Sequence, residues 1–174
     1  MRIFPAVFLA LAVTQVGADT TALRVRAVEI VGYGIFTARE TTRDDRRSGP
    51  PLAGDVVKGI TFTDYTTTIP AQLGTSFGIQ YLINSSPKGA SFPVTCVILF
   101  PEGGLVNPRG RVFQDSSEDL TTVIGRKTMY GYGFDEPWEL VPGEWVFEIW
   151  HKDTRLARKT FNVVLFEPED VPDG

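Results

Sequence analysis

Residues 140–150 of the chain read Leu-Val-Pro-Gly-Glu-Trp-Val-Phe-Glu-Ile-Trp, and this stretch decides the fold class. Trp145, Phe147 and Ile149 occupy every second position, which is the spacing of a β-strand that buries one face. The Pro-Gly pair just before them ends any incoming helix and permits a sharp turn. The stretch therefore predicts a tight corner that leads into a half-buried strand.

A second strand follows across a short polar turn. Lys152-Asp153-Thr154 is turn-prone, and Phe161, Val163 and Leu165 then alternate with their neighbours in the same period of two. The two strands together predict a hairpin. Burial of each large apolar side chain stabilises by roughly 1.5–3 kcal/mol, so this hairpin alone can anchor a core.

The rest of the chain repeats this pattern in shorter pieces. Segments rich in β-branched and aromatic residues are separated by turns that contain Gly, Pro and Asn, and no segment beyond the N-terminus has helical periodicity. A change of phase near residue 28 indicates a β-bulge in the first strand. Further strands are expected at residues 23–37, 77–83, 93–100 and 120–130, and residues 56–69 are expected to form one strand or a broken pair of strands. Arg43–Gly54, with mixed charge, Gly and Pro, is expected to be an exposed loop.

These observations predict an all-β chain. Its expected architecture is an antiparallel β-sandwich of about seven to nine strands, and a small closed barrel is the second possibility. We expect a single sandwich domain over residues 19–166 and an acidic, Pro-rich tail over residues 167–174.

The first 18 residues have the features of a secretory signal peptide. Arg2 supplies a positive charge, residues 3–13 are mostly apolar, and Val16-Gly17-Ala18 offers small residues for cleavage after Ala18. The apolar run is too short for a stable membrane anchor, so no membrane span is expected after cleavage. The sequence therefore predicts a periplasmic or secreted protein.

Charge and cysteine usage restrict the function further. Cleavage leaves 174 − 18 = 156 residues and removes one positive charge, so the net charge changes from −4 to about −5. A mildly acidic chain without a basic stripe argues against a nucleic-acid partner, because phosphate binding needs clustered Lys and Arg. Cys96 is the single cysteine, so no internal disulfide can form, and its apolar surroundings indicate a buried thiol.

No catalytic, cofactor-binding or metal-binding set is recognisable. His151 is the single histidine, and the partners that a catalytic triad or a histidine-based zinc site requires are missing, so we interpret it as a surface or structural residue. Asp135-Glu136 lies beside an aromatic residue, but a glycosidase needs two opposed carboxyl groups in a cleft. Turn formation is the first interpretation of these acids, and a polysaccharide hydrolase is the less favoured one.

Aromatic residues flanked by glycine are the candidates for ligand or partner binding: Tyr130, Tyr132, Phe134, Trp138 and, near the N-terminus, Tyr33. Two interpretations remain open. The rings can form an exposed stacking platform for a sugar or a peptide. Alternatively, the glycines let a ring from a neighbouring strand pack over bare backbone, which is a structural use.

Three segments together resemble one bacterial family: residues 69–78 (IPAQLGTSFG), 93–101 (PVTCVILFP) and 139–149 (ELVPGEWVFEI). The chain is similar to the family labelled domain of unknown function 3859 over about residues 27–164. This resemblance implies an exported bacterial protein with an immunoglobulin-like sandwich. The family has no assigned activity, so the resemblance transfers no catalytic or binding residue.

We therefore expect an exported, non-catalytic, immunoglobulin-like binding module that needs no cofactor. Its partner would be an unknown protein or glycan of the envelope, bound through loops, an exposed aromatic patch or an open edge strand. The first alternative is a structural or assembly component of the bacterial envelope, and the second is the hydrolase, because fold alone does not dictate function.

Overall fold

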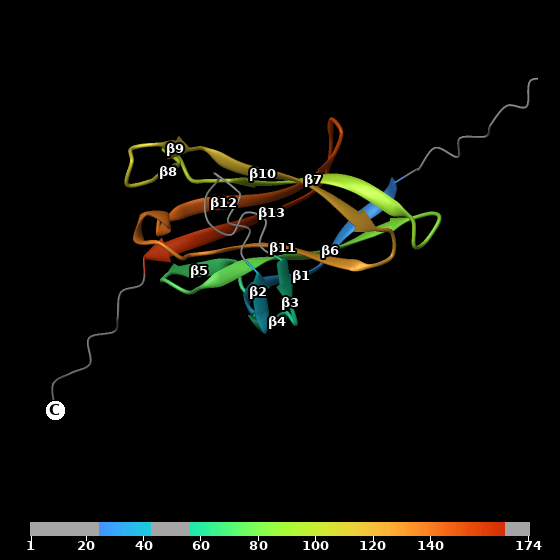
Figure 1. The fold of residues 1–174 in the computed structure, drawn as a ribbon, viewed down its shortest axis with the longest axis horizontal. Coiled ribbons are helices and arrows are strands. Elements are labelled where there is room, and N and C mark those ends of the chain that lie inside the picture. The colour runs from blue at the N-terminus through green and yellow to red at the C-terminus, as the bar shows by residue number, and fades with distance from the viewer. Residues whose placement is uncertain (1–24, 43–55, 166–174) are drawn as a thin grey trace, which may run out of the picture.

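The structure is a computed structural model that describes residues 25–42 and 56–165. Strands make up most of this part of the chain, and Figure 1 shows them as two stacked layers. One sheet has the strand order β11-β6-β1-β4, and the other has the order β10-β7-β12-β13-β5. Neighbouring strands are antiparallel except β13 and β5, which are parallel.

The strand bounds are as follows. The first sheet contains β1 (Val25–Thr37), β4 (Thr61–Asp64), β6 (Ser76–Ser85) and β11 (Lys127–Gly133). The second contains β5 (Thr68–Ala71), β7 (Ser91–Leu99), β10 (Asp115–Val123), β12 (Gly143–His151) and β13 (Thr154–Leu165). Two short ribbons pair β2 (Glu40–Thr42) with β3 (Val56–Lys58) and β8 (Leu105–Val106) with β9 (Val112–Phe113), and η1 (Pro137–Glu139) is a 3-10 turn.

Aromatic rings from both sheets meet in the core. The ring centroid of Phe77 in β6 lies 5.8 Å from that of Trp145, 5.5 Å from Phe147 and 5.3 Å from Phe161. The predicted inward-facing residues Trp145, Phe147 and Ile149 are all fully buried. The indole N–H of Trp145 also donates to the Val141 carbonyl at 3.0 Å, which fixes the corner before β12.

The structure confirms the all-β sandwich and the β12–β13 hairpin, and the two sheets of the described residues form separate layers rather than a closed barrel. It also confirms that the first strand is irregular, with register shifts between Val25 and Ala27 and between Ile30 and Gly32. The expected single strand at residues 120–130 is wrong. The chain turns at Gly125, where φ is +82°, and passes from β10 in one sheet to β11 in the other. The expected signal peptide, the acidic tail and most of the Arg43–Gly54 segment lie outside the described residues.

Candidate functional site

Three of the predicted aromatic residues belong to the core. The side chains of Tyr130, Tyr132 and Phe134 are 5%, 1% and 0% exposed. The Tyr132 ring lies 4.9 Å from that of Trp145, and the Tyr130 hydroxyl donates to the Cys96 carbonyl at 3.2 Å. The exposed-platform interpretation is therefore wrong for these three residues, because alternate side chains of β11 and its extension point between the sheets.

The glycines beside these rings have a structural explanation. Gly131 of β11 and Gly34 of β1 both pair with Gly78 of β6, so a row of three glycines crosses the first sheet. A Cβ atom added to Gly131 would lie 2.8 Å from the nearest ring atom of Phe36. The Phe36 ring therefore packs over bare backbone, as the structural interpretation of the glycines predicted.

Tyr33 and Trp138 retain some accessible surface. The Lys159 ammonium lies 3.4 Å from the ring centroid of Tyr33, within the range of a cation–π contact. Trp138 stacks on Phe113 with a centroid distance of 6.1 Å, and Arg111 lies 4.7 Å from the Phe113 ring centroid. Each ring is thus engaged within the domain, and ligand binding by Tyr33 or Trp138 stays a prediction.

Glu139, which the sequence analysis did not single out, anchors the corner before β12. Its carboxylate is fully buried and accepts the Tyr132 hydroxyl at 2.9 Å and the backbone N–H groups of Asp135 and Glu136 at 2.8 Å each. Burial raises the pKa of Glu139, although these hydrogen bonds act in the opposite direction. A sequence signal existed, because Pro at the first and Glu at the third position of a helical turn is a capping pattern.

The exposed acids Asp135 and Glu136 thus have a structural role through their backbone N–H groups. Both side chains are exposed, and neither lines the cavity described next. The described cavity therefore gives no support to the hydrolase interpretation, which requires two opposed carboxyl groups in a cleft.

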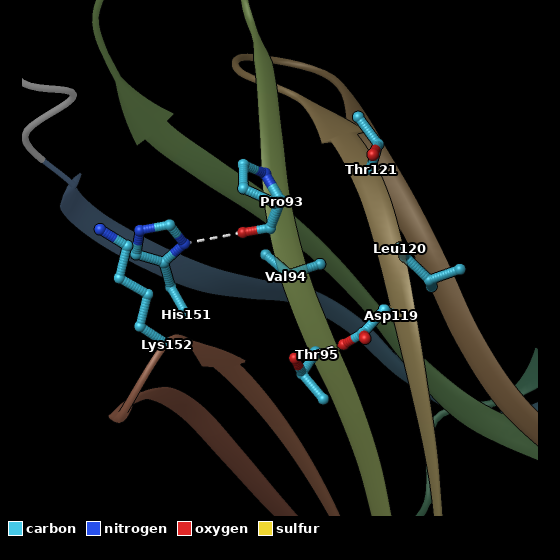
Figure 2. A pocket seen from close by; sticks show the side chains of 8 residues that line it. All are labelled: Pro93, Val94, Thr95, Asp119, Leu120, Thr121, His151 and Lys152. Atoms are coloured by element: carbon cyan, nitrogen blue, oxygen red, sulfur yellow. Dashed lines mark hydrogen bonds between the residues drawn. The ribbon is translucent and has the colours of Figure 1, made fainter.

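An open cavity of about 370 Å³ lies beside β10 (Figure 2). Asp119 accepts the Thr95 hydroxyl at 2.7 Å on one side of it. On the other side, His151 Nδ1 lies 2.8 Å from the Pro93 carbonyl oxygen, and the imidazole packs 4.4 Å from the Phe92 ring, so this histidine has the structural position that was predicted. The cavity is lined by Pro93, Val94, Thr95, Asp119, Leu120, Thr121, His151 and Lys152.

The walls of this cavity differ in charge. Figure 2 shows Asp119 on the β10 side and Lys152 with His151 on the opposite side. The electrostatics of the cavity alone therefore favour neither an anion nor a cation. In the described part of the chain, no three His, Cys, Asp or Glu side chains are grouped so that they could hold a metal ion.

The outer edge of β10 is the other accessible feature. This strand pairs with β7 through nine consecutive residues, from Asp115 opposite Leu99 to Val123 opposite Ser91, without a bulge. On its other side, no strand of the described residues pairs with it. Alternate residues of such an edge direct their backbone N–H and C=O groups away from the sheet.

The other sheet edges are less suited to pairing. Edge strands β4 and β5 have four residues each, and β5 contains Pro70, which has no N–H to donate. Edge strand β11 has seven residues, two of which are glycines. β10, with nine, is therefore the longest edge strand of the two sheets in the described residues.

Two mainly antiparallel sheets stacked around an aromatic core, with a tryptophan fixed at the last corner, define an immunoglobulin-like β-sandwich. A solved structure supports this class: an immunoglobulin-like protein from Pseudomonas aeruginosa is 27% identical and has a TM-score of 0.53, over 82% of this chain and 96% of that chain. The chain matches the family described as Domain of unknown function (DUF3859) over residues 24–163, and it belongs to that family. The family resemblance seen in the sequence is thus confirmed.

Other comparisons add no functional information. A search of curated proteins found no match. A second solved structure, the Pseudomonas fluorescens alkylpurine DNA glycosylase AlkC bound to DNA containing an abasic site analog, is 15% identical with a TM-score of 0.37, over 56% of this chain and 27% of that chain. That likeness is too weak to bear on this chain. No helix in the described residues has the length and apolar character needed to cross a membrane.

Proposed function

We propose that this chain is an exported, non-catalytic interaction module that binds a protein of the bacterial envelope by strand addition at β10. The observation that carries this proposal is the nine-residue, bulge-free edge of β10, with no pairing strand on its outer side among the described residues. An extended segment laid along this edge would gain a new ladder of main-chain hydrogen bonds. The signal-like residues 1–18 support export, because their charge, apolar run and small residues match a cleavable leader.

Strand addition is favoured over glycan stacking for a physical reason. Stacking on sugars requires exposed aromatic faces, whereas Tyr130, Tyr132 and Phe134 are enclosed in the core. A structural or assembly component of the envelope would use the same pairing at the β10 edge, but with a permanent partner. The interaction module and the assembly component therefore differ in the lifetime of the complex. Hydrolysis by Asp135 and Glu136 is not favoured, because these exposed acids do not line the described cavity.

The proposal is tested by site-specific photocrosslinking in intact cells of the bacterium that produces the chain. A benzoylphenylalanine at Ser117 places the reactive group on exposed β10, and the same residue at Thr68 places it on the exposed part of edge strand β5. We expect a crosslinked envelope protein from position 117 and none from position 68. Absence of a product at both positions, or equal products at both, would refute strand addition at β10.

A further inference from the structure

The charge of β10 indicates which kind of segment it accepts. Resting on the proposed strand addition, we propose that the partner segment is an extended peptide with basic residues on one face, spaced four residues apart. The strand reads Asp-Ser-Ser-Glu-Asp-Leu-Thr-Thr-Val, with three acidic residues and no basic residue. The recognised chemistry is therefore a Lys- or Arg-bearing β-strand.

Two of the three acids lie on the outer face of the second sheet, and an added strand would extend this face. Asp115 and Asp119 are exposed, and they alternate with the buried residues Ser116 and Glu118. Because side chains alternate across a strand, both aspartates lie on the outer face of the second sheet, four residues apart. The Thr95 hydroxyl holds one oxygen of Asp119 at 2.7 Å and so restricts the orientation of this carboxylate.

The geometry of a β-ladder turns this spacing into a sequence pattern. Directly opposed residues on neighbouring strands have their Cβ atoms about 4.5–5.5 Å apart, and opposite charges at such positions attract. The residues of a partner opposite Asp115 and Asp119 are likewise four apart, and Lys or Arg at those places can reach each carboxylate. The partner residue between them faces Ser117 and is free to be polar.

The inward side of the edge adds a second requirement. Ser116, Glu118, Leu120 and Thr122 point inward; the three polar residues are buried, and Leu120 is half-buried against the core. The intervening partner residues therefore meet mainly polar side chains, together with Leu120, near the rim of the core. Small or β-branched polar residues such as threonine suit these positions.

A second copy of the chain fits the edge poorly. If two β10 strands paired antiparallel about their common centre, Asp119 of one copy would lie opposite Asp119 of the other. Like charges directly opposed destabilise such a ladder. Charge complementarity thus favours a basic partner segment over self-association.

The test uses fluorescence anisotropy with the mature chain and labelled ten-residue peptides. One peptide alternates lysine with threonine, a second alternates glutamate with threonine, and a third is the lysine peptide with all of its backbone amides N-methylated, so that neither edge can donate an N–H group. We expect binding of the lysine peptide only, weakened by added salt. The double variant D115N/D119N should weaken this binding about fivefold, as the loss of two cross-strand charge pairs implies. D64N, which neutralises an exposed acid on β4 in the other sheet, should leave it unchanged.

The outcomes separate the two proposals. Equal binding of the lysine and glutamate peptides would overturn the charge preference and leave strand addition standing. Undiminished binding of the N-methylated peptide would instead overturn strand addition, because a peptide without backbone N–H donors cannot form the ladder. Failure of every peptide to bind would overturn the basic-segment inference. A dimer of the mature chain that D115N/D119N strengthens would overturn it as well. In both cases, photocrosslinking at position 117 tests strand addition separately.

Discussion

At the scale of single residues, Glu139 links the corner of the sandwich to its core. Its carboxylate joins a buried hydroxyl, Tyr132, to two backbone N–H groups at the start of η1. Desolvation is the main cause that raises the pKa of this group. The folded state therefore binds the Glu139 proton more tightly than the unfolded state does, and folding is linked to pH at this residue.

The sign of the linkage gives the first prediction. A carboxyl group with a raised pKa contributes stability that is present below its unfolded value, near 4.5, and is lost as the pH rises through the folded pKa. Glutamine at this position is neutral at all pH values, so E139Q should become more stable relative to the wild type as the pH rises from 4 to 8. Urea unfolding followed by tryptophan fluorescence measures this difference, and E144Q, which alters an exposed acid, is the control. A constant difference between E139Q and the wild type across this range would contradict the prediction.

Comparison of Cys96 with Glu139 shows what local sequence can reveal about a residue. The apolar run around Cys96 was enough to predict a buried thiol, and the structure confirms it. Burial raises the pKa of Cys96 to about 12, a value typical of an unreactive cysteine. Glu139, in the turn η1, has a polar, Pro-containing neighbourhood, and its carboxylate is held by the hydroxyl of Tyr132 in the preceding strand β11. Tyr132 is only seven residues away, but the local sequence does not show that its hydroxyl turns toward Glu139, so the weak capping pattern is the one signal in the sequence.

At the scale of elements, the glycine row explains how closely β1, β6 and β11 pack. Gly78 lies between Gly34 and Gly131 in the sheet, and a Cβ at Gly78 would clash with the Tyr130 carbonyl oxygen and with the Cα of Gly131. The obstacle is backbone, which cannot move without separating β6 from β11. At Gly131, by contrast, the two nearest atoms belong to the Phe36 ring, which can shift, and the nearest backbone atom, the Phe77 carbonyl oxygen, is 3.0 Å away.

This difference gives the second prediction. G78A should destabilise the fold by about 3 kcal/mol, the upper part of the range for overpacked sites, whereas G131A should cost about 1 kcal/mol because a side chain can give way. Denaturant unfolding of both variants measures the two values. Equal costs for the two substitutions would show that the β6–β11 backbone contact does not restrict residue 78.

The elements differ in how far the sequence could predict them. The β12–β13 hairpin was predictable because its two strands are adjacent and joined by a short polar turn. Residues 120–130 were misread because both β10 and β11 are rich in β-branched or aromatic residues, and only Gly125 marks the crossing between sheets. The Gly-flanked tyrosines were ambiguous for a related reason: local alternation does not show whether a face meets solvent or a second sheet. The sequence analysis named an open edge strand as one possible mode of binding. It did not indicate that β10 is an edge strand, because strand order depends on long-range pairing.

At the scale of the whole molecule, two features bear on how the domain stays folded and unaggregated: its single cysteine and the open edge of β10. With a single cysteine, the chain cannot form an internal disulfide, and its aromatic core holds the two sheets together. An exposed edge strand is an aggregation hazard, and charged residues are a common protection against unwanted pairing. In the proposed binding mode, the acids of β10 therefore have two effects: they disfavour pairing with a second copy of the chain and favour a basic partner segment.

Partner binding in the envelope requires that the chain be exported, and this gives the last prediction. Ala18 supplies the small residue that signal cleavage needs, so the periplasmic form should begin at Asp19. A18K should block cleavage and leave the uncleaved precursor, whereas A22K, which adds the same charge beyond the cleavage site, should be processed normally. Intact-mass measurement of the periplasmic and membrane fractions distinguishes these forms. An uncleaved wild-type chain confined to the cytoplasm would remove the export on which an envelope partner depends, even if β10 binds basic peptides in isolation.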